Sequence, residues 1–362
     1  MYPQRTLGTT RVPTDEGGPF PVLNGDARGP NGVGTPEYDA GTPESAPLSR
    51  KLERWWTQRA AAGPDAPVAI LRPMSPLANA TIATVGSGVM AEAMIAGLLR
   101  GELVAPSQVV ASHPRPERRE ALAREYGIRT AADNLEAMRD ADVVVLGIKP
   151  QMLDKVGREI GPHLRRGQLV LSVLAGATTT ALTRILGHDQ VVRSMPNTPA
   201  RLGKGVTVWY ATPQTTDPQR AQAAALLGAL GLQLEVDDEK MVAMATAVSG
   251  TGPTYVFLVM EALIDAAVHL GFPRHVAHDL VIETLEGSTL FAKQSGMHPA
   301  ELRNMVTSPG GTSAAALHEL ESGRLRTVLS EAVWAAFRRT VELGDQLESS
   351  IDVPGREDPR AR

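Results

Sequence analysis

Residues 307–320, TSPGGTSAAALHEL, place a Pro-Gly-Gly turn and several hydroxyl side chains at the start of a predicted helix. The first turn of any helix leaves backbone N–H groups without intrahelical partners, and one capping hydroxyl satisfies one of them for about 1 kcal/mol. A single cap explains one residue of this motif but not the whole group. The stretch is therefore a candidate ligand site as well as a helix start.

A second candidate is VGSGVMAEAMIAGLL, which reads Gly86-x-Gly88-x-x-Ala91. It follows a predicted strand and precedes an amphipathic helix, the context in which glycine backbones approach a pyrophosphate at a helix N-terminus. The alternative is a tight structural turn, which we consider the weaker interpretation. We predict a dinucleotide site whose loop comprises Gly86, Ser87, Gly88, Val89 and Met90.

The end of the second predicted strand indicates which nucleotide binds. Folds that bind NAD place an acidic residue there for the ribose hydroxyls, whereas this chain has ASHPRPERR. Ser112, His113 and Arg115 are side chains suited to a 2′-phosphate, so we expect NADPH as the cofactor, with NADH possible. The alternative is that Arg115 and Arg118 form only a solvated basic helix start.

Two further segments, GIKPQML and VRSMPNTPA, leave strands at the carboxyl edge of the predicted sheet, where ligands of such folds bind. Pro150 suits the first position of a helix. Loop closure without function is the alternative for the second segment. The additional cofactor contacts that we predict at strand ends and adjoining loops are Asn134, Ile148, Lys149, Pro150, Ala175 and Asn197.

Short runs rich in β-branched residues alternate with helical patterns between residues 81 and 195, as parallel βαβ units require. The predicted fold class is α/β, a Rossmann-like doubly wound sheet with helices on both faces, followed by an all-helical domain. GVTVWY and LQLEV are expected to add edge strands. The predicted parts are a disordered Pro/Gly-rich extension (1–78), the dinucleotide-binding domain (79–237), the helical domain (238–347) and a polar tail (348–362).

Composition restricts the class of protein. A net charge of −4 with mixed signs argues against a nucleic-acid surface, and no apolar run is long enough to span a bilayer, so we expect neither nucleic acid nor membrane as a partner. The chain has no cysteine, and its eight histidines show no metal-ligand spacing, so we expect no metal site. The first residues lack the pattern of a signal peptide, which makes the cytoplasm the expected location.

The ordered motifs VGSGVMAEA, GIKPQ, VRSMPNTPA, AVSGTGPTYVF and VTSPGGTSAAAL resemble the pyrroline-5-carboxylate reductase family over about residues 79–347. The resemblance implies reduction of the cyclic imine L-pyrroline-5-carboxylate to L-proline by NAD(P)H. It also implies a homo-oligomer in which C-terminal dimerisation helices interlock and each active site lies at a dimer interface. SGTGPTY is expected to start the long dimerisation helix.

The resemblance also explains the motif at 307–320, because the substrate carries a carboxylate that the N–H groups and positive end of a helix can bind. It implies a carboxylate cup formed by Val306, Ser308, Gly310, Gly311, Thr312 and Ser313. Thr312 or Ser313 is expected to hydrogen-bond near the reacting ring. A protonated imine already accepts hydride readily, so positioning matters more than a strong acid.

Three residues depart from the family pattern, which commonly has a polar residue at Val89, serine at Thr251 and aspartate at Ala243. A β-hydroxyacid dehydrogenase or another imine reductase would also join a Rossmann domain to helices. The hydroxyacid enzymes use a lysine in the long helix, and this chain has none between Lys240 and Lys293. A dinucleotide-binding scaffold without turnover is the remaining alternative.

Overall fold

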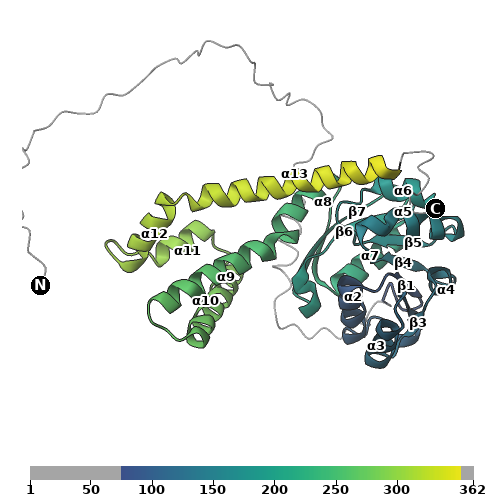
Figure 1. Ribbon diagram of the computed structural model, residues 1–362, viewed down its shortest axis with the longest axis horizontal. Helices are drawn as coiled ribbons and strands as arrows, with labels where there is room; N and C mark the ends of the chain where they lie inside the picture. The colour runs from purple at the N-terminus through teal and green to yellow at the C-terminus, as the bar shows by residue number, and fades with distance from the viewer. Residues whose placement is uncertain (1–74, 352–362) are drawn as a thin grey trace, which may run out of the picture. The chain divides into compact units, whose positions relative to one another are not determined.

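The computed structural model describes residues 75–351 (Figure 1). Its strands form one sheet in the spatial order β3-β2-β1-β4-β5-β6-β7-β8. All neighbouring strands are parallel except β6 and β7, which are antiparallel. The strands are β1 Ile82–Val85, β2 Val109–Ser112, β3 Arg129–Ala131, β4 Val143–Leu146, β5 Leu169–Ser172, β6 Val191–Met195, β7 Gly205–Ala211 and β8 Gly231–Glu235.

The predicted doubly wound sheet is confirmed. The chain runs outward from β1 to β3 and then returns to build β4 to β8 on the other side, so the order reverses between β1 and β4. In such sheets the crevice at the carboxyl ends beside this reversal is where ligands bind. The loops that follow β1, β2, β4 and β5 open towards this crevice, and they carry residues that the sequence predicts as dinucleotide contacts.

Two details of the predicted sheet were wrong. The strand at Gly205–Ala211, expected at an edge, lies between β6 and β8, and its Trp209 is almost completely buried. The true edges are β8 and β3, and β3 was not predicted because Arg129–Ala131 is short and half-exposed, without an apolar run.

Helices cover both faces of the sheet, as Figure 1 shows. Strand side chains alternate between two cores: Ile82, Val143 and Val145 face one, and Ala83, Val144 and Leu146 face the other. Helices α2, α3 and α7 close the first core, and α5, α6 and the end of α13 close the second. These helices are α2 Val89–Arg100, α3 Pro116–Tyr126, α4 Asn134–Met138, α5 Leu153–Ile160, α6 Thr179–Leu186 and α7 Asp217–Gly228.

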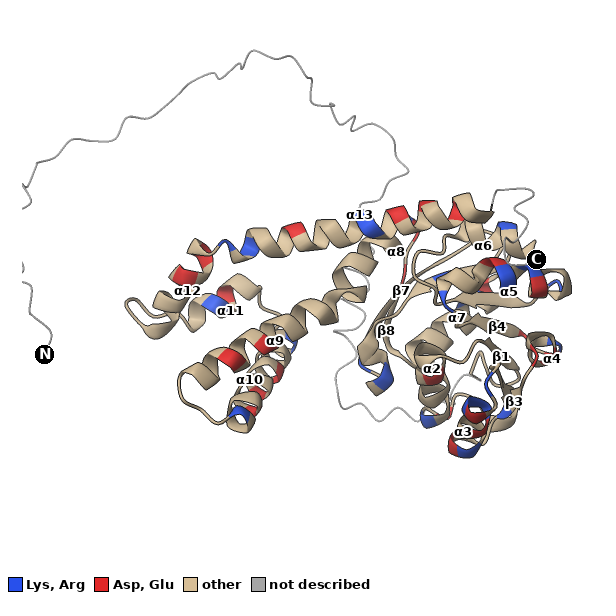
Figure 2. Cartoon of the chain, viewed as in Figure 1, with Lys and Arg blue, Asp and Glu red and all other residues tan. Residues whose placement is uncertain are grey.

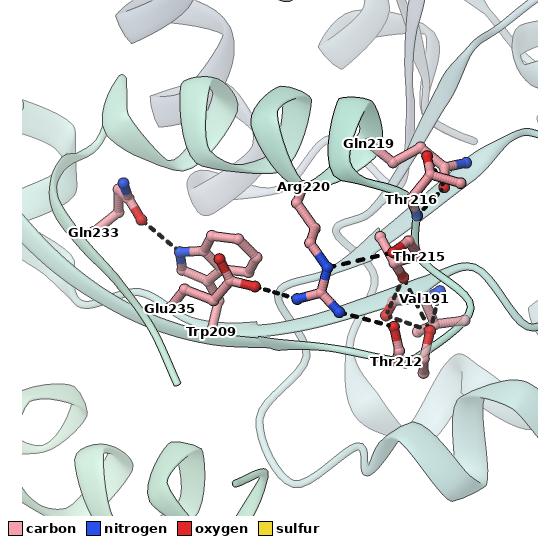
Figure 3. Close-up of polar contacts among 9 residues, drawn as sticks. All are labelled: Val191, Trp209, Thr212, Thr215, Thr216, Gln219, Arg220, Gln233 and Glu235. Carbon is pink, nitrogen blue, oxygen red and sulfur yellow. Dashed lines mark hydrogen bonds and ion pairs between the residues drawn. The ribbon is translucent and has the colours of Figure 1, made fainter. Parts of the chain in front are cut away.

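Polar contacts fasten the β7–α7–β8 edge (Figure 3). The Arg220 guanidinium on α7 pairs with Glu235 at the end of β8 and donates to the Thr212 and Thr215 carbonyl oxygens at 3.3 Å each. The Trp209 indole N–H donates to Gln233 Oε1 at 2.6 Å. This network stabilises the β7–β8 edge of the sheet and lies apart from the strand ends that form the candidate site.

Within the described residues, every regular element after β8 is a helix, as predicted. The elements are α8 Lys240–Ala245, α9 Gly252–His269, α10 Arg274–Ser295, α11 Pro299–Met305, α12 Thr312–Ser322 and α13 Leu325–Ile351. Lys, Arg, Asp and Glu are sparse along α9 in Figure 2, and none of its residues is buried. Its exposed apolar side chains include Phe257 and Leu258. An apolar helix surface of this size is typical of a protein interface.

The SGTGPTY motif starts α9, as expected, because Thr251 is the N-cap and Gly252 the first residue of this helix. The helical stretch extends further back than the motif, however. It begins at Lys240 with α8, and residues Thr246–Gly250 form a π-helical turn between α8 and α9, where the Thr251 N–H donates to the Thr246 carbonyl oxygen at 2.8 Å. Ser249 and Gly250 therefore mark a bulge inside one continuous helix. That helix, Lys240–His269, is long and apolar enough by length and composition to cross a membrane, and residues 75–351 contain one such helix.

The predicted extension (1–78) and polar tail (348–362) lie mostly outside the described residues. At the inner boundaries the structure differs from the prediction. Leu77 is completely buried, and Gln108 Nε2 donates to its carbonyl oxygen at 3.0 Å. At the other end α13 continues to Ile351, which is buried in the second core. Residues 75–78 and 348–351 are therefore part of the packed structure.

Candidate functional site

Gly86 ends β1 and turns the chain into the nucleotide loop with a left-handed φ of +81°. A Cβ added there would lie 2.5 Å from Ile148 Cγ2 and 2.9 Å from the Ile148 backbone nitrogen. Only glycine fits both the conformation and the space. The loops after β1 and β4 consequently pack directly against each other, which brings the predicted residues Gly86 and Ile148 together at the point where the strand order reverses.

Helix α2 begins at this loop with Gly88 as its N-cap, and no side chain caps it. The N–H groups of Gly88, Val89 and Met90 have no partner within residues 75–351. Val89, the apolar departure from the family pattern, is 58% exposed at the first helical position. A helix start with free N–H groups next to a glycine turn is a phosphate-binding arrangement.

Ser87 and Ser112 hold the loop from beneath rather than facing solvent, since both are completely buried. Ser87 Oγ lies 2.8 Å from Thr84 Oγ1 and donates to the Ser112 carbonyl oxygen at 3.0 Å. Ser112 Oγ lies 2.6 Å from Asn134 Oδ1, to which it donates. Asn134 in turn donates to Glu159 at 3.1 Å. The hydroxyls of these predicted cofactor residues are thus engaged with the protein.

His113 and Arg115 lie at the end of β2 and the start of α3. The Arg115 N–H donates to His113 Nδ1 at 3.2 Å. Burial first, and then the Arg115 and Arg118 guanidinium groups, lower the pKa of His113 below 6.5. Arg115 is exposed at the α3 N-cap, and its guanidinium has no hydrogen-bond or ion-pair partner in the described part of the chain.

Arg118, by contrast, is not a solvated charge. Its Nε donates to the Ser87 carbonyl oxygen at 3.2 Å, and its guanidinium pairs with Glu92 of α2 at 2.6 Å. The same Glu92 carboxylate accepts from the Tyr126 hydroxyl at 3.3 Å, and burial followed by the charge of Glu92 raises the pKa of Tyr126 to about 12. Arg118 therefore supports the predicted nucleotide loop. Its position in a run of basic residues did not predict this role.

The loops after β4 and β5 present exposed groups beside the same crevice. Lys149 is exposed and occupies the N-cap position of the short 3-10 helix Pro150–Met152, which confirms Pro150 at a helix start. Ala175 is exposed in the turn that precedes α6. Because parallel strands end at one edge of the sheet, these residues lie on the same side as Gly86.

Asn197 has a structural explanation as well as a predicted cofactor role. Its side chain is buried, with Nδ2 donating to the Ser249 carbonyl oxygen at 3.0 Å and Oδ1 accepting from the Val206 N–H at 2.9 Å. The residue therefore joins the loop after β6 to β7 and to the π-helical turn. These contacts use one of the two Nδ2 hydrogens and one of the two Oδ1 lone pairs.

The predicted carboxylate cup is an exposed turn between α11 and α12. Gly310 has a φ of +70°, and Gly311 is the N-cap of α12. A Cβ added to Gly311 would stand 2.4 Å from Ser308 Oγ, so the Ser308 hydroxyl folds over the turn. Thr312 and Ser313 are exposed, and Val306 is 68% exposed beside them.

The start of α12 repeats the features of the start of α2. No side chain caps it, and the N–H groups of Thr312, Ser313 and Ala314 have no partner within the described residues. The 11-residue helix directs its positive end at this turn. The geometry suits a small anion held by backbone N–H groups and flanking hydroxyls.

A groove of about 1040 Å³ also runs along α2, lined by Val89, Leu99, Arg100, Tyr126 and Arg201 among others. Its lining does not include Gly86, Lys149 or the cup. We therefore assign the candidate site to the crevice at the strand ends and to the cup, not to this groove.

Comparisons with known proteins agree with these features. Residues 239–343 match the family model described as pyrroline-5-carboxylate reductase dimerisation. Residues 81–176 match one described as NADP oxidoreductase coenzyme F420-dependent. The dimerisation match covers α9 and the cup, so the exposed apolar helices belong to a homo-oligomer, and the membrane-length helix Lys240–His269 is a dimerisation helix.

The pyrroline-5-carboxylate reductase of Pseudomonas aeruginosa is 42% identical, over 74% of this chain and 97% of that protein. The one from Synechocystis is 40% identical over 72% and 97%. A solved reductase from Coxiella burnetii superposes with a TM-score of 0.69 at 34% identity, covering 73% of this chain and 98% of that one. The Plasmodium falciparum reductase, solved with NADP bound, gives 0.68 at 27% identity over 75% and 100%. The chain belongs to the pyrroline-5-carboxylate reductase family.

Proposed function

We propose that this protein reduces L-pyrroline-5-carboxylate to L-proline with NADPH. The observation that carries the proposal is the pair of uncapped helix starts, one at Gly88 and one at Gly311, each with free backbone N–H groups beside a glycine turn. One suits the pyrophosphate of the cofactor and the other suits the carboxylate of a small substrate.

The residues present fit a dinucleotide phosphate. The Gly86 turn lets the backbone approach the pyrophosphate, and the α2 start supplies N–H groups to it. Arg115, whose guanidinium is free of partners among residues 75–351, and His113 would bind the 2′-phosphate. The exposed Lys149 and Ala175 would line the half of the crevice that takes the nicotinamide. When bound, NADPH supplies a hydride.

The cup would hold the substrate carboxylate on the N–H groups of Thr312, Ser313 and Ala314. Gly311 leaves room for this approach because it has no side chain, and the Ser308 hydroxyl closes the turn from one side. Val306 provides an apolar wall for the ring carbons. Thr312 or Ser313 would place a hydroxyl near the ring nitrogen.

Little acid catalysis is needed, since the imine nitrogen is already protonated when the C=N carbon accepts the hydride. The two electrons of the hydride form the new C–H bond, the C=N π electrons become the lone pair of the amine, and solvent supplies any further proton. The protein contributes orientation and electrostatic binding, which lower the barrier by holding the two reacting carbons together.

We propose further that the cup of one protomer serves the nucleotide crevice of another. Val306 and the first residues of α12 are solvent-exposed in the single chain, although a ring-binding cup must exclude water. The match to the dimerisation model covers the cup itself. Association through α9 and α13 would cover the apolar surface and complete the site.

A β-hydroxyacid dehydrogenase is the less favoured candidate, because α9 carries no lysine to act as acid and base. Steady-state assays test the proposal: purified protein with NADPH and a panel of cyclic imines, following the loss of nicotinamide absorbance. We expect turnover with pyrroline-5-carboxylate and little with imines that lack the carboxylate. Binding of NADPH without oxidation by any imine would indicate a non-catalytic scaffold and overturn the proposal.

A further inference from the structure

Helix α6, which follows the loop after β5, receives two carboxylates at its first turn, both from helices of the C-terminal part. Thr178 is its N-cap and Thr179 its first residue. Glu239, at the start of α8, binds Thr179, and Glu348, near the end of α13, binds Thr178. Each acidic group lies at the positive end of α6, where negative charge stabilises a helix.

Glu239 also forms an ion pair with a buried arginine. Its Oε1 accepts from the Thr179 N–H at 2.7 Å and from the Arg193 guanidinium at 2.6 Å, and its Oε2 accepts from the Thr179 hydroxyl. Arg193, on the inner strand β6, is only 5% exposed. The Glu239 carboxylate therefore links strand β6, the start of α6 and the start of α8. The sequence around Glu239 did not predict these contacts.

Glu348 closes the same loop from α13. It accepts from the Thr178 hydroxyl, which in turn accepts from the Ala181 N–H at 3.1 Å. Immediately before, Gly176 has a φ of +78°, and a Cβ there would lie 3.3 Å from the Leu343 Cβ. The loop that carries the exposed Ala175 is thus held directly against α13.

We infer that Glu239 and Glu348 are positioning residues for hydride transfer. This rests on the proposed function, in which the loop at Ala175 lines the nicotinamide half of the crevice. Helix α8 continues through the π turn into α9, and α13 packs on α12, which starts at the cup. The two carboxylates therefore attach the cofactor-side loop to the helices that would pair with a second protomer, whose cup would complete the site.

The expected consequence is kinetic. A small change in the position of the loop changes the distance between the reacting carbons, and a displacement near 1 Å can reduce the rate by about 100-fold. Binding of NADPH through the Gly86 turn and Arg115 depends on other loops. Loss of either carboxylate should therefore lower kcat while leaving the affinity for NADPH unchanged.

Glu348→Ala is the primary test, because this variant removes the acceptor for Thr178 without leaving a buried charge unpaired. We expect kcat to fall roughly 10-fold or more, and the primary isotope effect with NADPH deuterated at the transferred position to increase, because hydride transfer becomes slower. Glu348→Gln keeps an oxygen acceptor and should restore most of the rate. Glu342→Ala is the matched control, since Glu342 lies on the same helix and, among residues 75–351, pairs only with the exposed Arg339.

Glu239→Gln tests the second carboxylate, because it preserves shape but removes the charge that faces Arg193. We expect the same rise in isotope effect. If Glu348→Ala and Glu239→Gln both show the kcat and isotope effect of Glu342→Ala, the inference is overturned. This holds even if their melting temperatures fall, because loss of a purely structural contact lowers stability without changing hydride transfer. Wild-type turnover of pyrroline-5-carboxylate tests the proposed function separately: an inactive wild type contradicts that proposal, whereas an active wild type with unaffected variants contradicts only the inference.

Discussion

A methyl group on Gly86 would stand 2.5 Å from Ile148 Cγ2, so the loops that follow β1 and β4 are in direct contact. Gly86 also has a φ of +81°, which costs other residues about 1–3 kcal/mol. The nucleotide loop is therefore shaped by the loop after β4 as much as by its own glycines.

Gly86→Ala is expected to displace this loop and weaken NADPH binding by at least about 10-fold, the equivalent of 1.4 kcal/mol. The KM of pyrroline-5-carboxylate should change little, because the cup lies on other elements. Fluorescence titration with NADPH checks the first effect and steady-state kinetics the second. Gly187→Ala is the control, since Gly187 also has a positive φ, +58°, but has no neighbour within 4 Å of an added Cβ. Equal NADPH affinities for the two variants would contradict the assignment.

Gly311→Val should act on the substrate instead. Its Cβ would occupy the space of the Ser308 hydroxyl, 2.4 Å away, and its methyl groups would cover the free N–H groups of α12. We expect a steep rise in the KM of pyrroline-5-carboxylate with NADPH affinity unchanged.

Thr312→Val, which keeps the shape, should cost about 1–3 kcal/mol in kcat/KM if its hydroxyl faces a charged group.

Gly311→Ala combined with Ser308→Gly provides the control for the cup, because it removes the clash with the Ser308 hydroxyl. Partial recovery of substrate KM relative to Gly311→Ala alone would identify the clash as the cause. Wild-type kinetics for Gly311→Val, or loss of NADPH binding before loss of substrate binding, would make the turn a helix cap or a dimer contact.

Arg115→Asp is expected to shift preference from NADPH towards NADH. Loss of a charged hydrogen bond to the 2′-phosphate costs about 1.5–3 kcal/mol, or roughly 10- to 100-fold in the ratio of kcat/KM values. Arg118→Ala should weaken both cofactors alike, because Arg118 supports the loop through Ser87 and Glu92. Similar cofactor ratios for wild type and Arg115→Asp would count against the assignment of the phosphate site.

The pH dependence of NADPH binding should reveal His113. Its pKa is lowered below 6.5 in the free protein, so at pH 8 the imidazole is neutral. A bound 2′-phosphate favours the charged form and raises the pKa, so the contribution of His113 grows as pH falls through the pKa of the bound state and is lost as pH rises above it. His113→Gln should therefore weaken NADPH binding more at pH 6 than at pH 8. The difference in NADPH affinity between wild type and variant removes the effect of the titration of the phosphate itself. An affinity difference that does not change with pH would contradict the role of His113.

A chain shortened to begin at Ser75 is expected to retain its thermal stability and kcat, because the composition of residues 1–74 shows no sustained apolar period. Leu77→Ala in the same chain should reduce the free energy of unfolding by about 2–5 kcal/mol, because Leu77 is completely buried. Chemical denaturation measures both. Aggregation of the shortened chain would show that the preceding residues have a structural role.

The sequence predicted correctly those structural features that depend on residues within one segment. The β-branched runs predicted the parallel strands, and the glycines at 86 and 88 between a strand and a helix predicted the nucleotide loop. The Pro-Gly-Gly turn before α12 is likewise a helix start in the structure, as its residues indicate. Such features follow from backbone conformation and from the alternation of apolar residues, which neighbours in sequence determine.

Contacts between distant residues depended on the tertiary structure. The sequence offers a solvated helix start as the alternative for Arg118 and predicts a cofactor contact for Asn197. Packing adds contacts that the sequence does not show: Arg118 pairs with Glu92, and Asn197 donates to Ser249, 52 residues away. Glu239 reaches Thr179 across 60 residues. The position of β7 inside the sheet depended on β8 pairing with it. Contacts between distant residues depend on which strands and side chains meet when the whole sheet assembles. The spacing of apolar residues within one segment does not determine those partners.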